Sequence, residues 1–300
     1  MSGLPSATQR KLFEGLARPG GAFAMVALDQ RGSLENMLRA SGRPVDQAEI
    51  DRFRSSTVQA LTPLASAILL EKGFLSRTQP SGRWTGSCGL IVAADELVQP
   101  PDLPVEDSRI DPAGATLAVE LGAQALKLLV LWFAGEANEA QGALVDDFVR
   151  LAHDHGMLAL VEGLVRPARH GGAGAPSGRD LIAAAERFSV GADIYKGQVP
   201  TQDGDSPEAV EQLSRELTSR LECPWVVLST GIPAERFASL VGAACRGGAS
   251  GFLAGRAIWS HSLTSADPSA DLKGPAASGL LELVAIVDAD ARPWWEGLPA

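Results

Sequence analysis

The chain has little of what disulfide-stapled or metal-binding proteins depend on. It holds three cysteines and four histidines in 300 residues. The cysteines, Cys88, Cys223 and Cys245, have neither metal-ligand nor CxxC spacing, which indicates a reducing compartment rather than a disulfide framework. The histidines form no HxxxH or HExxH pattern, and the glycine-rich stretch Gly172–Ser177 only approaches GxGxxG and does not open a helix directly after a strand. We therefore expect no metal ion and no nucleotide cofactor.

Basic runs and long apolar runs are also missing. The net charge is −10 and no cluster of lysine and arginine stands out, which argues against a nucleic-acid partner. No apolar stretch reaches the roughly 18 residues that a membrane-spanning helix needs. The first residues, Met1–Ser6, lack the charged-then-apolar pattern of a secretory signal. We expect a cytoplasmic protein that does not bind membranes.

What the chain does have is a hydrophobic fraction of 45% arranged in short apolar runs. Most runs are near-continuous in apolar residues, which is typical of parallel strands buried on both faces. The strand candidates are Ala22–Asp29, Ser66–Glu71, Gly89–Ala94, Ala125–Leu131, Met157–Glu162, Asp193–Val199, Trp225–Ser229 and Gly251–Ala254.

Amphipathic stretches separate these runs. The helix candidates are Leu34–Ser41, Gln47–Thr62, Pro112–Leu121, Glu136–His155, Gly178–Val190, Ser206–Leu221, Pro233–Arg246 and a final helix near Ser278–Ala289. An eightfold alternation of strand and helix without a composition break predicts an α/β fold, a single (β/α)8 TIM barrel over residues 1–300 with a short C-terminal tail. A doubly wound sheet is the alternative. Three long loops, Lys72–Cys88, Glu96–Asp111 and Arg166–Gly178, would leave the active-site face of a barrel.

The tail carries Trp294 and Trp295 next to each other. Two adjacent tryptophans beyond the last helix suggest docking on the barrel or on a second subunit. A homo-oligomer therefore stays possible.

Lys196 is the most informative residue. It lies inside the apolar run Ala192–Pro200, and a strand interior is a poor place for an ammonium group. An unpaired buried cation tends to lose its proton, and a neutral lysine amine can attack a carbonyl carbon to form a Schiff base. The alternative is a structural salt bridge to a carboxylate.

Three further charged residues lie on other strand candidates. Asp29 ends the first run, Lys127 lies within the fourth, and Glu162 ends the fifth. Ionisable groups on several strands of one barrel converge at its mouth, which favours a catalytic site over structural pairing. We expect Lys127 to lower the pKa of Lys196 by like-charge repulsion. Glu162 would transfer protons, while Asp29 would hold a substrate hydroxyl or orient the lysines.

Neighbouring residues complete a candidate substrate site. Gln30 and Arg31 follow Asp29 directly, and Gln198 shares a strand face with Lys196. We expect these three side chains to contact the substrate.

The last two strand candidates are followed by glycine-containing turns. These turns contribute Ser229, Thr230 and Gly231 after the seventh strand, and Gly255 and Arg256 after the eighth. Barrels frequently bind phosphate at these two loops through backbone N–H groups, a short helix N-terminus and an arginine. We expect a phosphate site here, with ordinary turn glycines as the alternative.

With these residues in view, the chain resembles the class I aldolases of the tagatose-1,6-bisphosphate and sulfofructosephosphate aldolase type. The resemblance is carried by Phe23–Arg31, Ala125–Val130, Glu162–Pro167, Asp193–Lys196, Pro224–Gly231 and Gly248–Ala257 with Trp259. It is closer to the sulfosugar branch, given the strand around Lys127, the Arg166–Pro167 pair and Pro224–Trp225.

The resemblance implies a cofactor-free barrel that cleaves a phosphorylated ketose through a lysine imine. On the family pattern Lys196 is the Schiff-base lysine, Glu162 is the acid/base group, and Asp29 and Lys127 support them. The residues that fall on the phosphate loops are Ser229, Gly231, Gly255 and Arg256.

The chain departs from that pattern at two places. Gly197–Gln198 follows the lysine where the family usually has Val-Glu, and Gly163 follows Glu162 where it often has proline. Gln198 in place of glutamate would remove a negative charge beside the imine, and this change affects which substrate the site would accept.

Three hypotheses follow. The first is an aldolase that releases dihydroxyacetone phosphate and an aldehyde from a phosphorylated ketose. The second is a phosphosugar isomerase or lyase on the same barrel that never forms an imine. The third, motivated by Gln198 and Gly163, is a catalytically silent protein that binds a sugar phosphate.

Overall fold

The computed structural model describes residues 6–79, 83–100, 103–169, 177–200, 206–230, 232 and 234–298. Its barrel strands are β1 (Phe23–Leu28), β2 (Ala67–Glu71), β3 (Gly89–Ala93), β6 (Ala125–Phe133), β7 (Leu158–Arg166), β8 (Ile194–Gln198), β9 (Trp225–Leu228) and β10 (Gly251–Ala254). All neighbours pair in parallel and the ring closes, because β1 pairs with both β2 and β10. The predicted (β/α)8 barrel is confirmed, and the doubly wound sheet, which would leave two free edges, is wrong.

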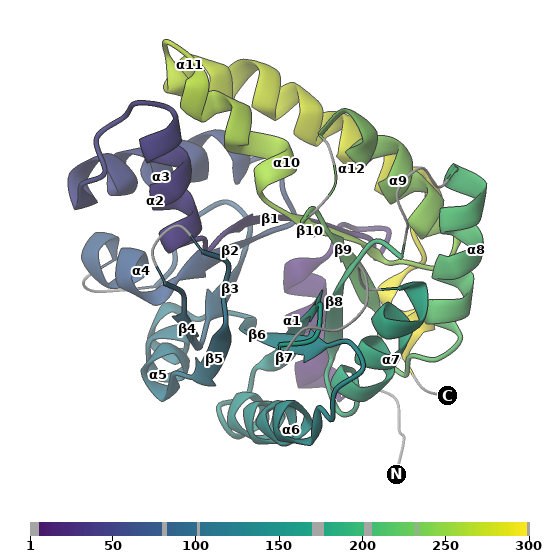
Figure 1. Ribbon diagram of the computed structural model, residues 1–300. Coiled ribbons are helices and arrows are strands. Elements are labelled where there is room, and N and C mark those ends of the chain that lie inside the picture. The colour runs from purple at the N-terminus through teal and green to yellow at the C-terminus, as the bar shows by residue number, and fades with distance from the viewer. Residues whose placement is uncertain are drawn as a thin grey trace.

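Helices ring the strands on the outside (Figure 1). The ring contains α2 (Gly32–Ala40), α3 (Gln47–Leu61), α4 (Lys72–Thr78), α5 (Pro112–Leu121), α6 (Glu139–Asp154), α7 (Gly178–Phe188), α8 (Pro207–Thr218), α9 (Ala234–Arg246), α10 (Arg256–Trp259), α11 (Pro268–Asp271) and α12 (Ala277–Asp290), whereas α1 (Ala7–Leu16) lies at one end of the barrel. Helix α8 begins as its residues favour: Ser206 Oγ accepts a hydrogen bond from the N–H of Ala209, and Pro207 occupies the first turn.

Strands β6 and β7 are longer than predicted. They pair over nine residues, from Ala125 opposite Leu158 to Phe133 opposite Arg166. The extension of β7 carries Leu164 and Arg166 beyond Glu162, out to the carboxyl-terminal mouth of the barrel.

Two of the three predicted long loops contain regular structure. Lys72–Cys88 begins with α4, because the Glu71 carboxylate accepts hydrogen bonds from the first N–H groups of that helix. Glu96–Asp111 contains an antiparallel hairpin of β4 (Asp95–Val98) and β5 (Asp107–Ile110). The third loop lies partly outside the described residues.

The barrel interior is a separate apolar cluster. Alternate residues of the strands fill it, among them Phe23, Met25, Ile91 and Leu160, while the residues between them pack outward against the helices. At the carboxyl-terminal end this apolar filling gives way to charged residues.

Helix α1 closes the amino-terminal end of the barrel. Phe13 and Leu16 pack onto the interior cluster, and the Phe13 ring stacks on Trp294 with centroids 4.5 Å apart. Figure 1 shows α1 behind the strands when the barrel is viewed along its axis. The tail was expected to dock on the barrel or on a second subunit. Trp294 docks on the barrel, whereas Trp295 is 46% exposed.

Candidate active site

Asp29, Lys127, Glu162 and Lys196 meet at the carboxyl-terminal end of the barrel. All four are buried, and none is more than 7% exposed. They arrive from β1, β6, β7 and β8, on the inward-facing positions immediately above the apolar interior. The sequence prediction that these four side chains converge is confirmed.

Lys127 stands at the centre of the charged cluster. Its Nζ lies 2.7 Å from Asp29 Oδ2, 3.0 Å from Glu162 Oε2 and 3.2 Å from Asp95 Oδ2. Lys196 Nζ lies 2.9 Å from the same Oε2 of Glu162. Glu162 therefore bridges the two lysines.

Asp95 is a member of this cluster that the sequence reading missed. Its Oδ2 contacts Lys127 and accepts a hydrogen bond from the N–H of Leu129 at 2.9 Å, and its Oδ1 is 2.8 Å from Arg31. The side chain is fully buried. One signal could have found it: Asp95 lies two residues beyond the inward-facing Ala93, so it shares that face if the strand direction continues.

The cluster fixes the charge of its members. Burial by itself would raise the pKa of Asp29, but the charges of Lys127 and Lys196 outweigh it and hold that pKa well below its ordinary value. Burial likewise opposes the charged form of Lys127, yet Asp29, Asp95 and Glu162 raise its pKa above the ordinary lysine value. The pKa of Glu162 is lowered by Lys127 and Lys196 against the effect of burial. Lys127 is thus an ammonium group, and both acids are carboxylates.

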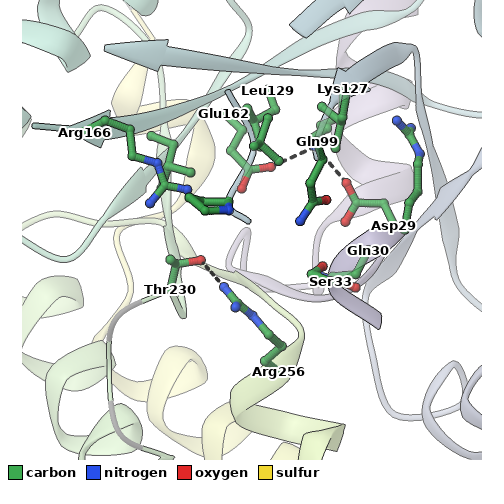
Figure 2. A pocket seen from close by; sticks show the side chains of 15 residues that line it. Asp29, Gln30, Ser33, Gln99, Lys127, Leu129, Glu162, Arg166, Thr230 and Arg256 are labelled. Carbon is green, nitrogen blue, oxygen red and sulfur yellow. Dashed lines mark hydrogen bonds and ion pairs between the residues drawn. The ribbon is translucent and has the colours of Figure 1, made fainter. Parts of the chain in front are cut away.

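A cavity of about 260 Å³ opens above the cluster. Asp29, Lys127 and Glu162 form part of its wall. Lys196 does not line the cavity, but its Nζ contacts the carboxylate of Glu162, which does. Figure 2 shows the Lys127 contacts to Asp29 and Glu162 at one side of the cavity and Arg166, Thr230 and Arg256 at another.

Four of the predicted substrate-binding residues line this cavity: Gln30, Arg31, Thr230 and Arg256. Arg256 lies in the first turn of α10 and donates a hydrogen bond from Nη2 to Thr230 Oγ1 at 2.7 Å. The buried Oε1 of Gln30 has no hydrogen-bond partner, which leaves it free for a ligand.

The other predicted binding residues have different surroundings. Gln198 does not line the cavity, because its Oε1 accepts a hydrogen bond from the N–H of Val165 at 2.7 Å and so ties β8 to β7. Ser229 is half-buried and also off the cavity wall. Gly255 contacts the backbone of β1 so closely that a Cβ would lie 2.4 Å from the Ala27 oxygen. Gly231 lies outside the described residues.

Arg166 is a second residue that the site reading left out. It lines the cavity from the end of β7, and its buried Nε has no hydrogen-bond partner. Burial lowers its pKa, and so does the positive charge of Arg256. The Arg166–Pro167 pair marked this position in the sequence, but only the nine-residue length of β7 shows that it reaches the cavity.

The two glycines among the departures from the family pattern, Gly163 and Gly197, lie against one side chain. A Cβ on Gly163 would lie 2.3 Å from the Tyr195 hydroxyl, and one on Gly197 would lie 2.7 Å from its ring. The Tyr195 ring is buried on the outer side of the barrel, where it covers both glycines. The two glycines therefore make room for Tyr195, whereas Gln198, the remaining departure, is held by the N–H of Val165.

Within the described part of the chain, no group of three or more His, Cys, Asp or Glu side chains is arranged to hold a metal ion. A search of the same residues finds no helix with the length and apolarity to span a membrane.

Comparison with known proteins identifies relatives along nearly the whole chain. The tagatose 1,6-diphosphate aldolase of Listeria monocytogenes serotype 4a is 25% identical over 320 residues, covering 94% of this chain and 93% of that protein. Tagatose 1,6-diphosphate aldolase 2 of Streptococcus pyogenes serotype M3 is 26% identical over 329 residues, covering 96% and 97%. These relatives do not support the expected closeness to the sulfosugar branch.

The fold has a counterpart among solved structures. Fructose-bisphosphate aldolase from Plasmodium falciparum, in complex with TRAP and a small-molecule inhibitor, superposes with a TM-score of 0.67 and covers 99% of this chain and 97% of that one. At 13% identity this likeness concerns the fold alone.

The family itself is shown by a third comparison. The model of the DeoC/LacD family of aldolases matches residues 23–261, from the first barrel strand to just beyond the last. The expectation of an aldolase, a carbon–carbon lyase, is thereby confirmed. This chain belongs to the DeoC/LacD family of aldolases.

Proposed function

We propose that the protein is a class I aldolase that cleaves a phosphorylated ketose to dihydroxyacetone phosphate and an aldehyde through a Schiff base on Lys196. The observation that carries the proposal is the 2.9 Å contact between Lys196 Nζ and Glu162 Oε2 at the edge of a cavity. A lysine beside a group that can take its proton is the arrangement that an amine nucleophile requires.

Imine formation uses this pair. Lys196 passes one proton to Glu162, and its neutral amine adds to the ketose carbonyl carbon, C2. Glu162 then returns the proton to the C2 hydroxyl, which leaves as water while the C=N bond forms. The iminium that results carries the positive charge that the ammonium carried before.

Carbon–carbon cleavage uses Glu162 again. Its carboxylate accepts the proton of the C4 hydroxyl, the C3–C4 bond breaks, and the electron pair moves into the iminium to give an enamine and an aldehyde. Glu162 then protonates C3, and water hydrolyses the new iminium to dihydroxyacetone phosphate and free Lys196. The aldehyde leaves between these two events.

Lys127 and Asp29 support the proton transfers. The Lys127 ammonium, 3.0 Å from Glu162, stabilises the carboxylate form to which Glu162 must return after each transfer. Asp29 balances the charge of Lys127 at 2.7 Å and borders the cavity, where it can accept a hydrogen bond from a substrate hydroxyl.

Arg256 is the proposed contact of the phosphate. It lies at the start of α10 after β10, and the loops after the last two strands are where barrels frequently bind phosphate. Thr230, its hydrogen-bond partner, brings the loop after β9 to the same point.

Borohydride trapping tests the proposal. Protein incubated with dihydroxyacetone phosphate and reduced should gain one three-carbon phosphate adduct, located on the peptide that contains Lys196. Lys196→Arg should gain none and should lose turnover while it keeps its fold, because a guanidinium cannot form the imine. The matched control is Lys72→Arg, a lysine paired with Asp111 outside the cavity wall, which should behave like the parent.

Two results would contradict the proposal. Release of triose phosphate without any adduct would indicate a lyase or isomerase that never forms an imine. Binding of dihydroxyacetone phosphate with neither adduct nor turnover would indicate a silent binding protein.

A further inference from the structure

The cations of this chain can be counted without omission. Every lysine and arginine lies among the described residues, because the segments outside them contain neither. The cations on the cavity wall, or in contact with its carboxylates, are Arg31, Lys127, Lys196, Arg166 and Arg256.

Three of these five cations are balanced by three carboxylates. The ion pairs are Lys127 with Asp29 at 2.7 Å, Arg31 with Asp95 at 2.8 Å, and Lys196 with Glu162 at 2.9 Å. The neighbouring buried Glu71 is itself balanced by Arg54 at 2.7 Å. Among the described residues, two positive charges at the cavity are therefore left without a carboxylate.

The two unbalanced cations are Arg166 and Arg256. Neither has a carboxylate partner among the described residues, and the hydrogen bond of Arg256 goes to the neutral Thr230. The two groups are close enough for the charge of Arg256 to lower the pKa of Arg166. Figure 2 shows both guanidinium groups on the same side of the cavity, with Thr230 beside them. Two like charges held together in this way form a site for one dianion.

Another stretch of the cavity wall is apolar. Leu97 and Val105 of the β4–β5 hairpin face Leu129 of β6 and Leu164 of β7, and the four belong to one apolar cluster. The nearby polar side chain from the hairpin is Gln99, which is neutral. Among the described residues on this stretch of the cavity wall none is a cation, so an anion placed against it would lose water without gaining a charged partner there, which is costly.

We infer that the substrate carries a single dianionic group, the phosphate of its dihydroxyacetone half, and that its aldehyde half is uncharged. The inference rests on the proposed function. A phosphate ester carries about −1.5 to −2 charge at pH 7, which matches the two unbalanced arginines. A ketose bisphosphate, or a sulfonated ketose phosphate, would bring a second anion to the apolar wall.

Condensation assays with matched acceptors test the inference. Dihydroxyacetone phosphate is the donor, and the acceptors are D-glyceraldehyde, D-glyceraldehyde 3-phosphate and 3-sulfolactaldehyde. We expect kcat/KM for D-glyceraldehyde to exceed that for either charged acceptor by at least about tenfold, the scale of one unmet charged contact. Equal or better use of either charged acceptor would overturn the inference.

A pair of valine variants tests the wall itself. Val105 and Val98 belong to the same hairpin, but Val105 lines the cavity, whereas Val98 is 40% exposed and does not. Val105→Lys should raise kcat/KM for D-glyceraldehyde 3-phosphate about tenfold or more, because it supplies the missing cation. Val98→Lys should leave the acceptor ranking unchanged. If the two variants behave alike, the apolar wall does not set the preference.

Failure of the inference can be told apart from failure of the proposed function. Borohydride trapping with dihydroxyacetone phosphate involves no acceptor. An adduct on Lys196 together with a preference for a charged aldehyde would overturn only the inference. No adduct at all would overturn the function on which it rests.

Discussion

Glu162 and Lys196 are register partners on the neighbouring parallel strands β7 and β8, and their side chains meet at 2.9 Å. Partners in parallel register face the same side of a sheet, so the backbone pairing delivers both groups to the interior without help from a loop. Their separation is fixed by the strands, so the proposed proton acceptor, Glu162, is in place before a substrate arrives.

Glu162→Gln should retain the hydrogen bond to Lys196 but lose the proton-transfer group. We expect kcat to fall roughly 10²–10⁴-fold, the usual size of a general acid–base contribution, with a smaller change in KM. Steady-state cleavage assays measure both. A variant with kcat unchanged would remove Glu162 from the mechanism.

Arg256→Ala should weaken phosphorylated ligands. A charge-assisted contact contributes about 1.5–3 kcal/mol, so affinity for dihydroxyacetone phosphate should drop about ten- to a hundredfold. Imine formation with unphosphorylated dihydroxyacetone should change little. Titration of both ligands, with the imine trapped by borohydride, is the measurement. Equal loss for the two ligands would make Arg256 a structural residue of the barrel rim. Arg166→Ala should follow the same pattern.

Asp95→Asn should separate positioning from catalysis. The amide oxygen can still accept the hydrogen bond from Leu129, but the charge that holds Arg31 and Lys127 is gone. We expect a loss of stability of roughly 1–3 kcal/mol, since Lys127 keeps two other carboxylates.

Two measurements check the Asp95 prediction. Urea unfolding reports the stability, and the pH profile of kcat should shift because the charge around Lys127 has changed. A stability loss without any shift in the pH profile would assign Asp95 a purely structural role.

Stability should fall at acid pH. The folded-state pKa values of Asp29 and Glu162 lie below their ordinary values of 3.8 and 4.5, so the stability that they contribute is present above those values. It should be lost progressively as the pH falls through them toward the lower folded-state values. Lys127, whose pKa is raised, keeps its contribution throughout this range.

Urea midpoints for the parent and for Asp29→Asn, measured between neutral and acid pH, test this dependence. At neutral pH the urea midpoint of Asp29→Asn should be lower than that of the parent, and it should fall less as the pH is lowered. Parallel curves for the two proteins would contradict the assignment.

The sequence was sufficient for the barrel because its strands are buried on both faces. Runs such as Ala125–Leu131 are apolar at nearly every position, which distinguishes them from the amphipathic helix candidates that lie between them. Asp29, Lys127, Glu162 and Lys196 could be found because a charged side chain within or at the end of an apolar run implies either a functional site or a buried ion pair.

Asp95 and Arg166 were not predicted as site residues, because their positions depend on tertiary structure. Asp95 lies beyond the predicted end of its strand, at the start of an expected loop, so the alternation that puts Ala93 inward was not extended to it; the structure instead continues with β4, which pairs with β5. Arg166 follows an apolar run whose end the sequence does not define. The length of β7 becomes clear only from its pairing with β6, which continues as far as Arg166. For Gln198 the predicted strand position was right, but the predicted contact with the substrate was not supported. Its side-chain oxygen instead accepts a hydrogen bond from a backbone N–H of β7.

Phe13, Leu16 and Trp294 close the amino-terminal end of the barrel interior, so a ligand has to reach the charged cluster from the carboxyl-terminal mouth. In the proposed reaction the ketose, the water and both products would all use this mouth. The water needed for the final hydrolysis would then pass the place that the aldehyde occupied, so we expect the aldehyde to leave before that water enters.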